Sequence, residues 1–225
     1  MTPYWQDEKR GLTIYHGDCR AILPTFADGE FGSVVTDPPY GIGFADWDIP
    51  PDSAILQQCL RVAEGSVVMF GGAPMRSLVT FTALDPPPDR LLIWAPSFHC
   101  AKATANGMFF RYSPVWAWRL PKKQKVFWCD VWRESTSHHF KAVNHPGQKP
   151  RRVMEQVVEA FGGRSTLDPY MGSGTTLVAA AKLGIPACGV EREEKYCRMA
   201  VCRLEGGFMA DEPAHLFNQK EDAPA

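Results

Sequence analysis

The chain has 225 residues, enough for one substantial core but too few for two domains of normal size. Its 45% hydrophobic and 22% charged residues are typical of a packed globular protein and exclude a disordered or fibrous chain. Because the formal net charge is −1, any nucleic-acid partner must be bound by a local basic surface. No apolar run approaches the ~20 residues of a bilayer span, and residues 1–10 lack the apolar segment of a secretion signal. We therefore expect a cytoplasmic protein without membrane association.

Seven cysteines are scattered along the chain without a Cys-x-x-Cys pair, and their odd number argues against a disulfide framework. His99, Cys100, Cys129, His138 and His139 match no spacing that is typical of zinc ligands. The sequence therefore predicts reduced thiols and no metal site.

Short β-branched or apolar runs alternate with stretches of helical periodicity, the pattern of a mostly parallel sheet flanked by helices. These features predict a single α/β domain over residues 1–225 with seven strands. In chain order the expected elements are strands at 12–15, 33–36, 66–70, 90–94 and 115–119, 164–167 and 187–190, and helices at 52–63, 151–161, 175–183 and 193–204.

Three segments do not fit this alternation. Residues 85–89 contain three consecutive prolines and are expected to form a loop. Residues 97–145, interrupted by the 115–119 strand, contain a local concentration of basic and aromatic side chains. The segment 206–225 has no periodicity and is expected to be a flexible tail.

The strand at 33–36 ends at Asp37, Pro38, Pro39 and Tyr40. Proline fixes its own φ and confines the preceding residue to extended geometry, so the Asp37 carboxylate and the Pro38 carbonyl are held as an acceptor pair. Tyr40 adds a flat stacking surface. This arrangement suits a planar ring that carries an amine, although an ordinary proline turn with an exposed acid is the simpler alternative for so short a motif.

A second motif combines a strand end, a glycine turn and a helix start, which together offer backbone N–H groups to an anion. Asp168 at the strand end would accept from an ammonium group, and Leu177 stands where a dinucleotide-binding turn has its third glycine. Glu191, after the next strand, is placed to accept from ribose hydroxyls. A ligand with an amino acid joined to a nucleoside is S-adenosylmethionine. The alternative is a plain helix cap.

These motifs resemble those of the amino-methyltransferases that modify DNA at adenine N6 or cytosine N4, from about residue 15 to residue 204. The resemblance implies a Rossmann-like methyltransferase fold in a circularly permuted, β-type motif order with seven strands. It implies a catalytic role for Asp37, Pro38, Pro39 and Tyr40. It implies that the cofactor is bound by Asp168, Pro169, Tyr170, Gly172, Ser173, Gly174, Thr175, Thr176 and Glu191.

Two shorter segments extend the resemblance. His145-Pro-Gly-Gln-Lys149-Pro resembles the family segment that helps to form the methionine pocket, and Gly17-Asp18 resembles the segment whose acid contacts the cofactor adenine. Either segment could instead be a simple turn or cap. The implied cofactor residues are therefore extended by Asp18 and Lys149.

The resemblance also implies DNA as the substrate, with the target base flipped out of the duplex or single-stranded. The segment 97–145 is short for a target-recognition insertion, and within it we expect Lys122, Lys123, Lys125 and Arg133 to bind phosphates, unless they form a solvated charged loop.

Asp37 favours adenine N6, because the N4 enzymes of this family more often have serine before Pro-Pro. Cytosine N4, an RNA or other amine, and an inactive binding module remain alternatives. A nuclease motif is absent from the sequence, so any restriction partner would be another chain. The oligomeric state is left open, a homodimer included.

Overall fold

The structure is a computed structural model that describes residues 1–41, 48–49, 52–72, 75–96, 112–122, 129–134 and 148–206. From position 207 on, the expected tail lies outside these residues. Within them no helix is long and apolar enough to cross a membrane.

One sheet runs through the described part of the chain, with nine strands in the order β1-β2-β9-β8-β3-β4-β6-β5-β7. In chain order the strands are β1 (Trp5–Asp7), β2 (Leu12–His16), β3 (Ser33–Thr36), β4 (Val67–Phe70), β5 (Arg90–Pro96), β6 (Ser113–Trp118), β7 (Val131–Glu134), β8 (Thr166–Asp168) and β9 (Ala187–Glu191). The five neighbours β2, β9, β8, β3 and β4 are parallel, whereas β6 runs antiparallel between β4 and β5.

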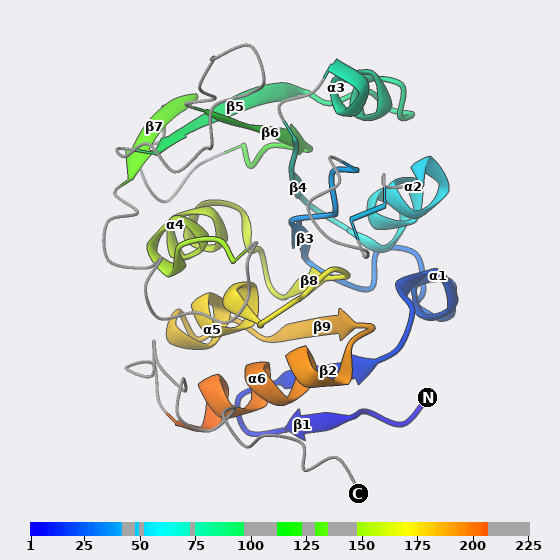
Figure 1. Ribbon diagram of the computed structural model, residues 1–225, viewed down its shortest axis with the longest axis vertical. Coiled ribbons are helices and arrows are strands. Elements are labelled where there is room, and N and C mark those ends of the chain that lie inside the picture. Colours follow the sequence, from blue (N-terminus) through cyan, green and yellow to red (C-terminus); the bar gives the residue numbers. More distant parts are fainter. Residues whose placement is uncertain are drawn as a thin grey trace, which may run out of the picture.

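Helices cover both faces of this sheet (Figure 1). They are α1 (Cys19–Ile22), the 3₁₀ turn η1 (Leu23–Thr25), α2 (Ser53–Val62), α3 (Met75–Thr82), α4 (Arg151–Phe161), α5 (Thr175–Lys182) and α6 (Glu194–Glu205). One core joins the apolar sides of α4, α5 and α6 to the sheet, and a second core joins α1, α2 and α3 to the opposite face. The protein is therefore a three-layer α/β structure.

The predicted fold class is confirmed, and the strand at 33–36 and the helix at 151–161 match their predicted bounds. All four residues of β3 are buried, as expected for a strand covered on both faces. The sheet has nine strands rather than the seven expected, because β1 and β7 were not predicted. Neither short edge strand has the run of buried residues that marks the central ones. The helices α1 and α3, of four and eight residues, were also missed.

The order of the strands places the functional motifs side by side. Parallel neighbours end at the same edge of a sheet, so the residues that follow β2, β9, β8 and β3 line up along one edge. From β8 the chain crosses to β9 through α5, and from β3 it crosses to β4 through α2 on the opposite face. A crevice for ligands is expected where neighbouring strands turn to opposite sides, here between β8 and β3.

Candidate active site

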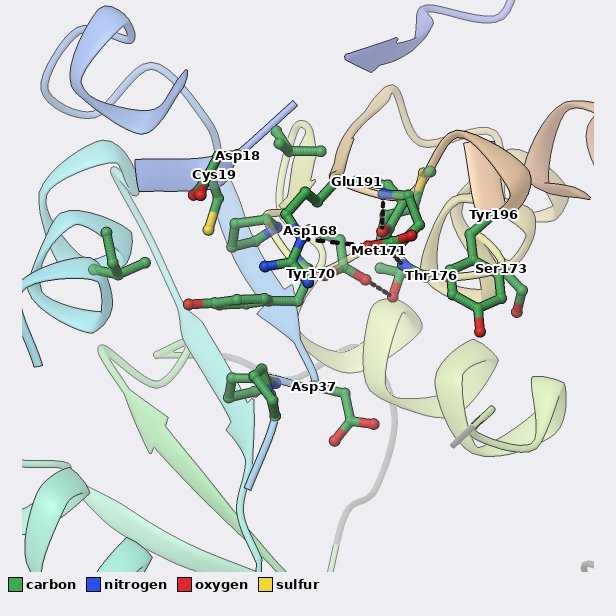
Figure 2. Close-up of a pocket in the computed structure, with 18 of the residues that line it drawn as sticks. Asp18, Cys19, Asp37, Asp168, Tyr170, Met171, Ser173, Thr176, Glu191 and Tyr196 are labelled. Atoms are coloured by element: carbon green, nitrogen blue, oxygen red, sulfur yellow. Dashed lines mark hydrogen bonds and ion pairs between the residues drawn. The ribbon is translucent and has the colours of Figure 1, made fainter. Parts of the chain in front are cut away.

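A cavity of about 440 Å³ opens at this edge of the sheet. Its lining combines the segments after β2, β3, β8 and β9 with the residues before α4. Of the predicted catalytic and cofactor residues, those that line it are Asp18, Asp37, Pro38, Pro39, Tyr40, Lys149, Asp168, Pro169, Tyr170, Gly172, Ser173, Thr175, Thr176 and Glu191. Gly174 is absent from the lining but caps α5 directly beneath it. The structure thus brings both motifs to one cavity (Figure 2).

The glycine turn requires its glycines for two physical reasons. Gly172 and Gly174 have φ values of +52° and +79°, in the left-handed region that favours glycine. A Cβ atom at Gly174 would also lie 2.6 Å from Cβ of Ala200 on α6. The turn is therefore pressed against α6 while the N-terminus of α5 points toward the cavity.

Arg203, on α6, is hydrogen-bonded to the glycine turn and was not predicted. Its side chain is 5% exposed, and Nη1 donates to the Ser173 carbonyl at 2.7 Å and to the hydroxyls of Ser173 and Thr175 at 3.1 Å. A signal for it was available: the spacing of Tyr196, Ala200 and Arg203 puts the arginine on the buried face of its helix, where an arginine is rarely buried without partners.

Asp168 joins the glycine turn to the catalytic strand. Oδ1 accepts from the Thr36 hydroxyl at 2.7 Å and from the Tyr170 N–H at 3.1 Å, and Oδ2 accepts from the Thr176 hydroxyl. Burial raises the pKa of Asp168 to about 6 in spite of these hydrogen bonds. A carboxylate has about four acceptor positions, so one position on Oδ2 remains for a ligand.

Glu191 has acceptor positions to spare on both oxygens. Oε2 accepts from the Gly172 N–H at 2.9 Å and Oε1 from the Glu193 N–H at 2.7 Å. Burial raises the pKa of Glu191 above its ordinary value. Two backbone donors thus orient the carboxylate and leave one further acceptor position on each oxygen, enough for two ligand hydroxyls.

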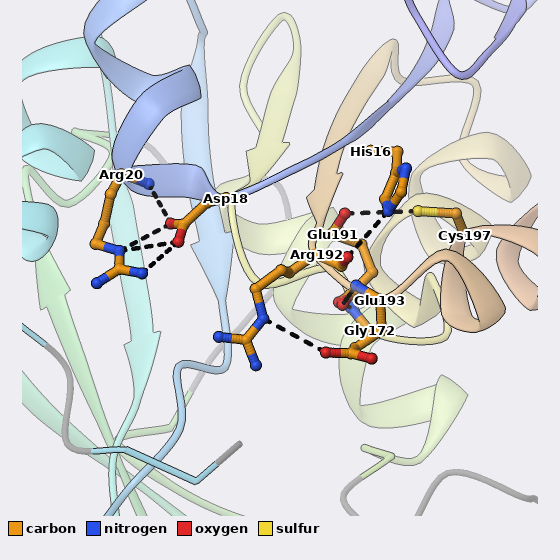
Figure 3. A network of polar contacts seen from close by, with 8 residues as sticks. All are labelled: His16, Asp18, Arg20, Gly172, Glu191, Arg192, Glu193 and Cys197. Carbon is orange, nitrogen blue, oxygen red and sulfur yellow. Dashed lines mark hydrogen bonds and ion pairs between the residues drawn. The ribbon is translucent and has the colours of Figure 1, made fainter. Parts of the chain in front are cut away.

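Asp18 lies across the cavity from Glu191 and is already engaged. It caps α1 by accepting from the Arg20 N–H at 2.9 Å, and both of its oxygens accept from the Arg20 guanidinium (Figure 3). The hydrogen bond from Arg20 lowers the pKa of Asp18. Since the Arg20 side chain is 65% exposed, a ligand could displace it at small cost.

The catalytic motif is held by contacts from both sides. The Tyr40 hydroxyl donates to Asp37 Oδ1, and the peptide N–H groups of Tyr40 and Gly41 donate to Oδ1 of the buried Asp48 at 2.7 and 2.8 Å. Burial, and then the charge of Asp37, holds the pKa of Tyr40 well above its ordinary value, so the phenol remains a donor. Asp48 was not predicted, and it follows a segment without a recognisable motif.

Residues 148 and 149 connect this end of the cavity to the glycine turn. Gln148 Oε1 accepts from the Ser173 hydroxyl at 2.6 Å. Lys149 Nζ donates to Asp37 Oδ2 and lies 3.1 Å from the Tyr40 hydroxyl oxygen. The resemblance assigned Lys149 to the methionine pocket; the structure places its ammonium group against the catalytic motif.

Of the predicted DNA-binding residues, the two that the structure describes, Lys122 and Arg133, are not part of the cavity lining. Lys122 is exposed just after β6 and Arg133 is exposed on β7, while Lys123 and Lys125 lie outside the described residues. Among the residues that the structure describes there is no cluster of three potential metal ligands. Of the residues weighed above as zinc ligands, His99, Cys100, His138 and His139 lie outside that part of the chain.

Comparison with known proteins identifies the family. Residues 99–202 match the family described as DNA methylase, which comprises N6 and N4 methyltransferases. Type II methyltransferase M2.DpnII of Streptococcus pneumoniae is 40% identical over 256 aligned positions, covering 90% of this chain and 92% of the relative. The crystal structure of M1.HpyAVI in complex with SAM has a TM-score of 0.64 at 21% identity, covering 85% of this chain and 99% of the other.

A further structure, the cytosine-N4-specific PvuII DNA methyltransferase, has a TM-score of 0.61 at 15% identity and covers 88% of this chain and 94% of the other. At these identities the two solved structures bear on the fold alone. The M2.DpnII relative carries the assignment further, because the similarity extends along nearly the whole of both chains: this chain belongs to the DNA amino-methyltransferase family.

Proposed function

We propose that the chain transfers a methyl group from S-adenosylmethionine to the N6 amine of adenine in DNA. The observation that carries this proposal is the place of the Asp37 carboxylate, which lines the same cavity as the glycine turn and is oriented by Tyr40 and Lys149. The methyl donor and the amine that accepts the methyl group would then bind in the same cavity.

The free acceptor positions fit S-adenosylmethionine. Glu191 has one on each carboxylate oxygen for the two ribose hydroxyls, and Asp168 has one for the ammonium group. The N-terminus of α5 favours the carboxylate of the ligand. The cavity, at about 440 Å³, lies within the ~300–1,000 Å³ of ordinary small-molecule sites. Asp18 would reach the adenine end once Arg20 moves away.

When bound, the cofactor supplies a methyl group on a positively charged sulfur, a reactive electrophile. The protein has to prepare the amine, whose lone pair is delocalised into the base ring. Hydrogen bonds from the amine to Asp37 and to the Pro38 carbonyl favour a pyramidal nitrogen and strengthen as positive charge develops on it. As the N–C bond forms, the bond between the sulfur and the methyl carbon would break with its electron pair left on the sulfur. The nitrogen then becomes acidic, and Asp37 can accept the released proton or pass it to water.

The target base must leave the duplex, or be single-stranded, to reach Asp37. We propose that Tyr40 stacks on this base, a contact that contributes ~1–3 kcal/mol. We also propose that the segment 97–145 helps to select the target and that Lys122, Lys123, Lys125 and Arg133 contact phosphates. Lys122 and Arg133 are exposed, as such contacts require.

The base that accepts the methyl group is the most specific part of this proposal. Asp37 in place of serine favours adenine N6, while cytosine N4 is the alternative within the same family. The decisive experiment incubates the purified protein with S-adenosylmethionine and, in separate reactions, unmethylated DNA or RNA, digests the nucleic acid to nucleosides and measures their masses. We expect N6-methyldeoxyadenosine; N4-methyldeoxycytidine would replace the proposed acceptor, and methylation of RNA alone would replace the substrate.

A further inference from the structure

The ammonium group of Lys149 is held in a built site at the catalytic end of the cavity. Its side chain is 13% exposed, and Nζ contacts both Asp37 Oδ2 and the Tyr40 hydroxyl. The same nitrogen lies 5.3 Å from the ring centroid of Tyr40 and 5.2 Å from that of Phe70, which ends β4. A carboxylate, a phenol and two aromatic faces therefore surround one cation.

The backbone and two side-chain contacts fix where this cation lies. Lys149 precedes Pro150, which caps α4, and the side chain of Gln148 is hydrogen-bonded to the glycine turn. The residue before a proline is confined to extended geometry, so the backbone of Lys149 has little freedom at this point. The contacts with Asp37 and Tyr40 then hold the ammonium group at the end of its flexible side chain.

We propose that Lys149 is a positioning residue for methyl transfer, which holds the Asp37 carboxylate aligned before the target base arrives. This inference rests on the proposed function and replaces the methionine pocket as the main role of Lys149. Asp37 is only 23% exposed, so the charged hydrogen bond from Lys149 takes the place of part of its hydration and orients it.

The geometry allows Lys149 to act without blocking the amine. Asp37 Oδ1 is taken by Tyr40 and Oδ2 by Lys149, which leaves one acceptor position on each oxygen for the base. Two further carboxyl groups lie near this pair. The charge of Asp37 is one of the causes that raise the pKa of Asp168, and Asp48 accepts from the peptide N–H groups of Tyr40 and Gly41. Lys149 therefore places a positive charge in a part of the cavity that holds three carboxyl groups.

The test compares Lys149→Met, which removes the charge, with Lys149→Arg, which keeps it. Lys182→Met is the matched control, because Lys182 is an exposed lysine paired with Glu155 away from the cavity. Single-turnover methyl transfer is measured at saturating S-adenosylmethionine and DNA. Affinity for S-adenosylmethionine is measured separately by calorimetry without DNA.

For Lys149→Met we expect about a 30-fold slower transfer at saturation, because the Asp37 carboxylate loses the charged donor that aligns it. Affinity for S-adenosylmethionine should stay within about threefold. Lys149→Arg, which keeps a charged donor, should recover most of the lost rate, and Lys182→Met should match the wild type throughout.

Two results would overturn the proposal. A loss of S-adenosylmethionine affinity of more than tenfold, with transfer at saturation unchanged, would make Lys149 a cofactor residue. Slowing of the same size in Lys149→Arg and in Lys149→Met would show that the charge of Lys149 does not act, and would reduce the residue to a structural role. If Lys149→Met unfolds below the assay temperature, Lys149→Gln takes its place.

A readout without substrate separates this proposal from the proposed function. The carboxyl carbons of aspartate are labelled with ¹³C, and the Asp37 signal is assigned from its loss in Asp37→Asn. Its chemical shift should differ between Lys149→Met and the wild type and be close to the wild-type value in Lys149→Arg, whatever the acceptor turns out to be. Equal chemical shifts in all three proteins refute the role of Lys149, whereas absence of DNA methylation by the wild type refutes only the function.

Discussion

The two ends of the cavity are held together by contacts of different range. At the cofactor end, the partners lie close in the chain: Thr176 donates to Asp168 eight positions earlier, and Gly172 donates to Glu191 nineteen positions later. At the catalytic end, Lys149 reaches Asp37 across 112 positions. The cofactor end is thus built from local contacts, whereas the catalytic end adds to its local contacts around Tyr40 a lysine that reaches it only once the sheet has formed.

The difference follows from the strand order. β8 and β9 are neighbours joined by a single helix, so a strand, a turn and the next strand already contain the cofactor contacts. β3 and β8 are neighbours in space but belong to opposite halves of the chain. The hydrogen bond from Thr36 to Asp168 spans 132 positions and ties the residue before Asp37 to the start of the glycine turn. Asp168 is therefore shared by both ends.

The largest expected effect comes from breaking the catalytic end alone. Asp37→Ala should slow methyl transfer by roughly two orders of magnitude or more, the scale for a missing oriented acceptor in the transition state. Affinity for S-adenosylmethionine and DNA should stay within a few-fold, because the glycine turn and Glu191 are untouched. Single-turnover kinetics and calorimetry measure the two quantities.

Asp28→Ala is the matched control for this variant, since Asp28 is an exposed aspartate paired with Arg61 outside the cavity. It should leave both quantities unchanged. Near-normal transfer by Asp37→Ala would remove the assigned role of the carboxylate even though the fold remains that of a methyltransferase.

The difference between local and long-range contacts also decides which parts of the site could be predicted from the sequence. The turn from Gly172 to Thr176 and the acid at Glu191 could be singled out because strand, turn and helix patterns are local, and all of these residues except Gly174 line the cavity. The contact between Lys149 and Asp37 could not be predicted, because it depends on β3 pairing with β8, which no local pattern encodes. Arg203 was missed although its place on the buried face of α6 marked it.

The strands at the edges of the sheet were also harder to predict from the sequence than those at its centre. Central strands such as β3 and β4 are buried at every position and were recognised from their apolar runs. The edge strand β1 has only three residues and none of them is buried, so the hydrophobic pattern carries no signal for it. Its pairing with β2 comes from the sheet edge that β2 offers, a tertiary effect.

The second expected effect tests the junction of the two ends at Asp168. Its pKa, raised to about 6 by burial, means that the native state binds a proton more tightly than the unfolded chain. This group therefore stabilises the fold least at high pH: the free energy of unfolding should fall as pH rises from about 4 through 6. Asp168→Asn should remove that fall and be more stable at pH 8 by about 2 kcal/mol, measured by urea unfolding.

The ionisation of Asp168 should also affect the affinity for S-adenosylmethionine. If the remaining acceptor position on Oδ2 takes the ammonium group, affinity for S-adenosylmethionine should rise with pH up to about 6 and then level off. Asp168→Asn should bind about tenfold more weakly at pH 8 and show no such rise, because a charge-assisted hydrogen bond is lost. Equal affinity of the two proteins at pH 8 would show that the ammonium group is held elsewhere.

The smallest expected effect comes from a change confined to the cofactor end. Glu191→Gln keeps the size of the side chain but removes the charge and turns one acceptor into a donor that faces the Gly172 or the Glu193 N–H. Affinity for S-adenosylmethionine should fall about fivefold, the value of one ordinary hydrogen bond, while transfer at saturating cofactor stays normal. Glu194→Gln, an exposed neighbour outside the cavity lining, is the control. Glu191 has no contact with Asp37 among the described residues. A slower transfer at saturation would therefore mean that the two ends of the cavity are coupled through the glycine turn. The connection would be Asp168, which accepts hydrogen bonds from Thr36 and from the Tyr170 N–H.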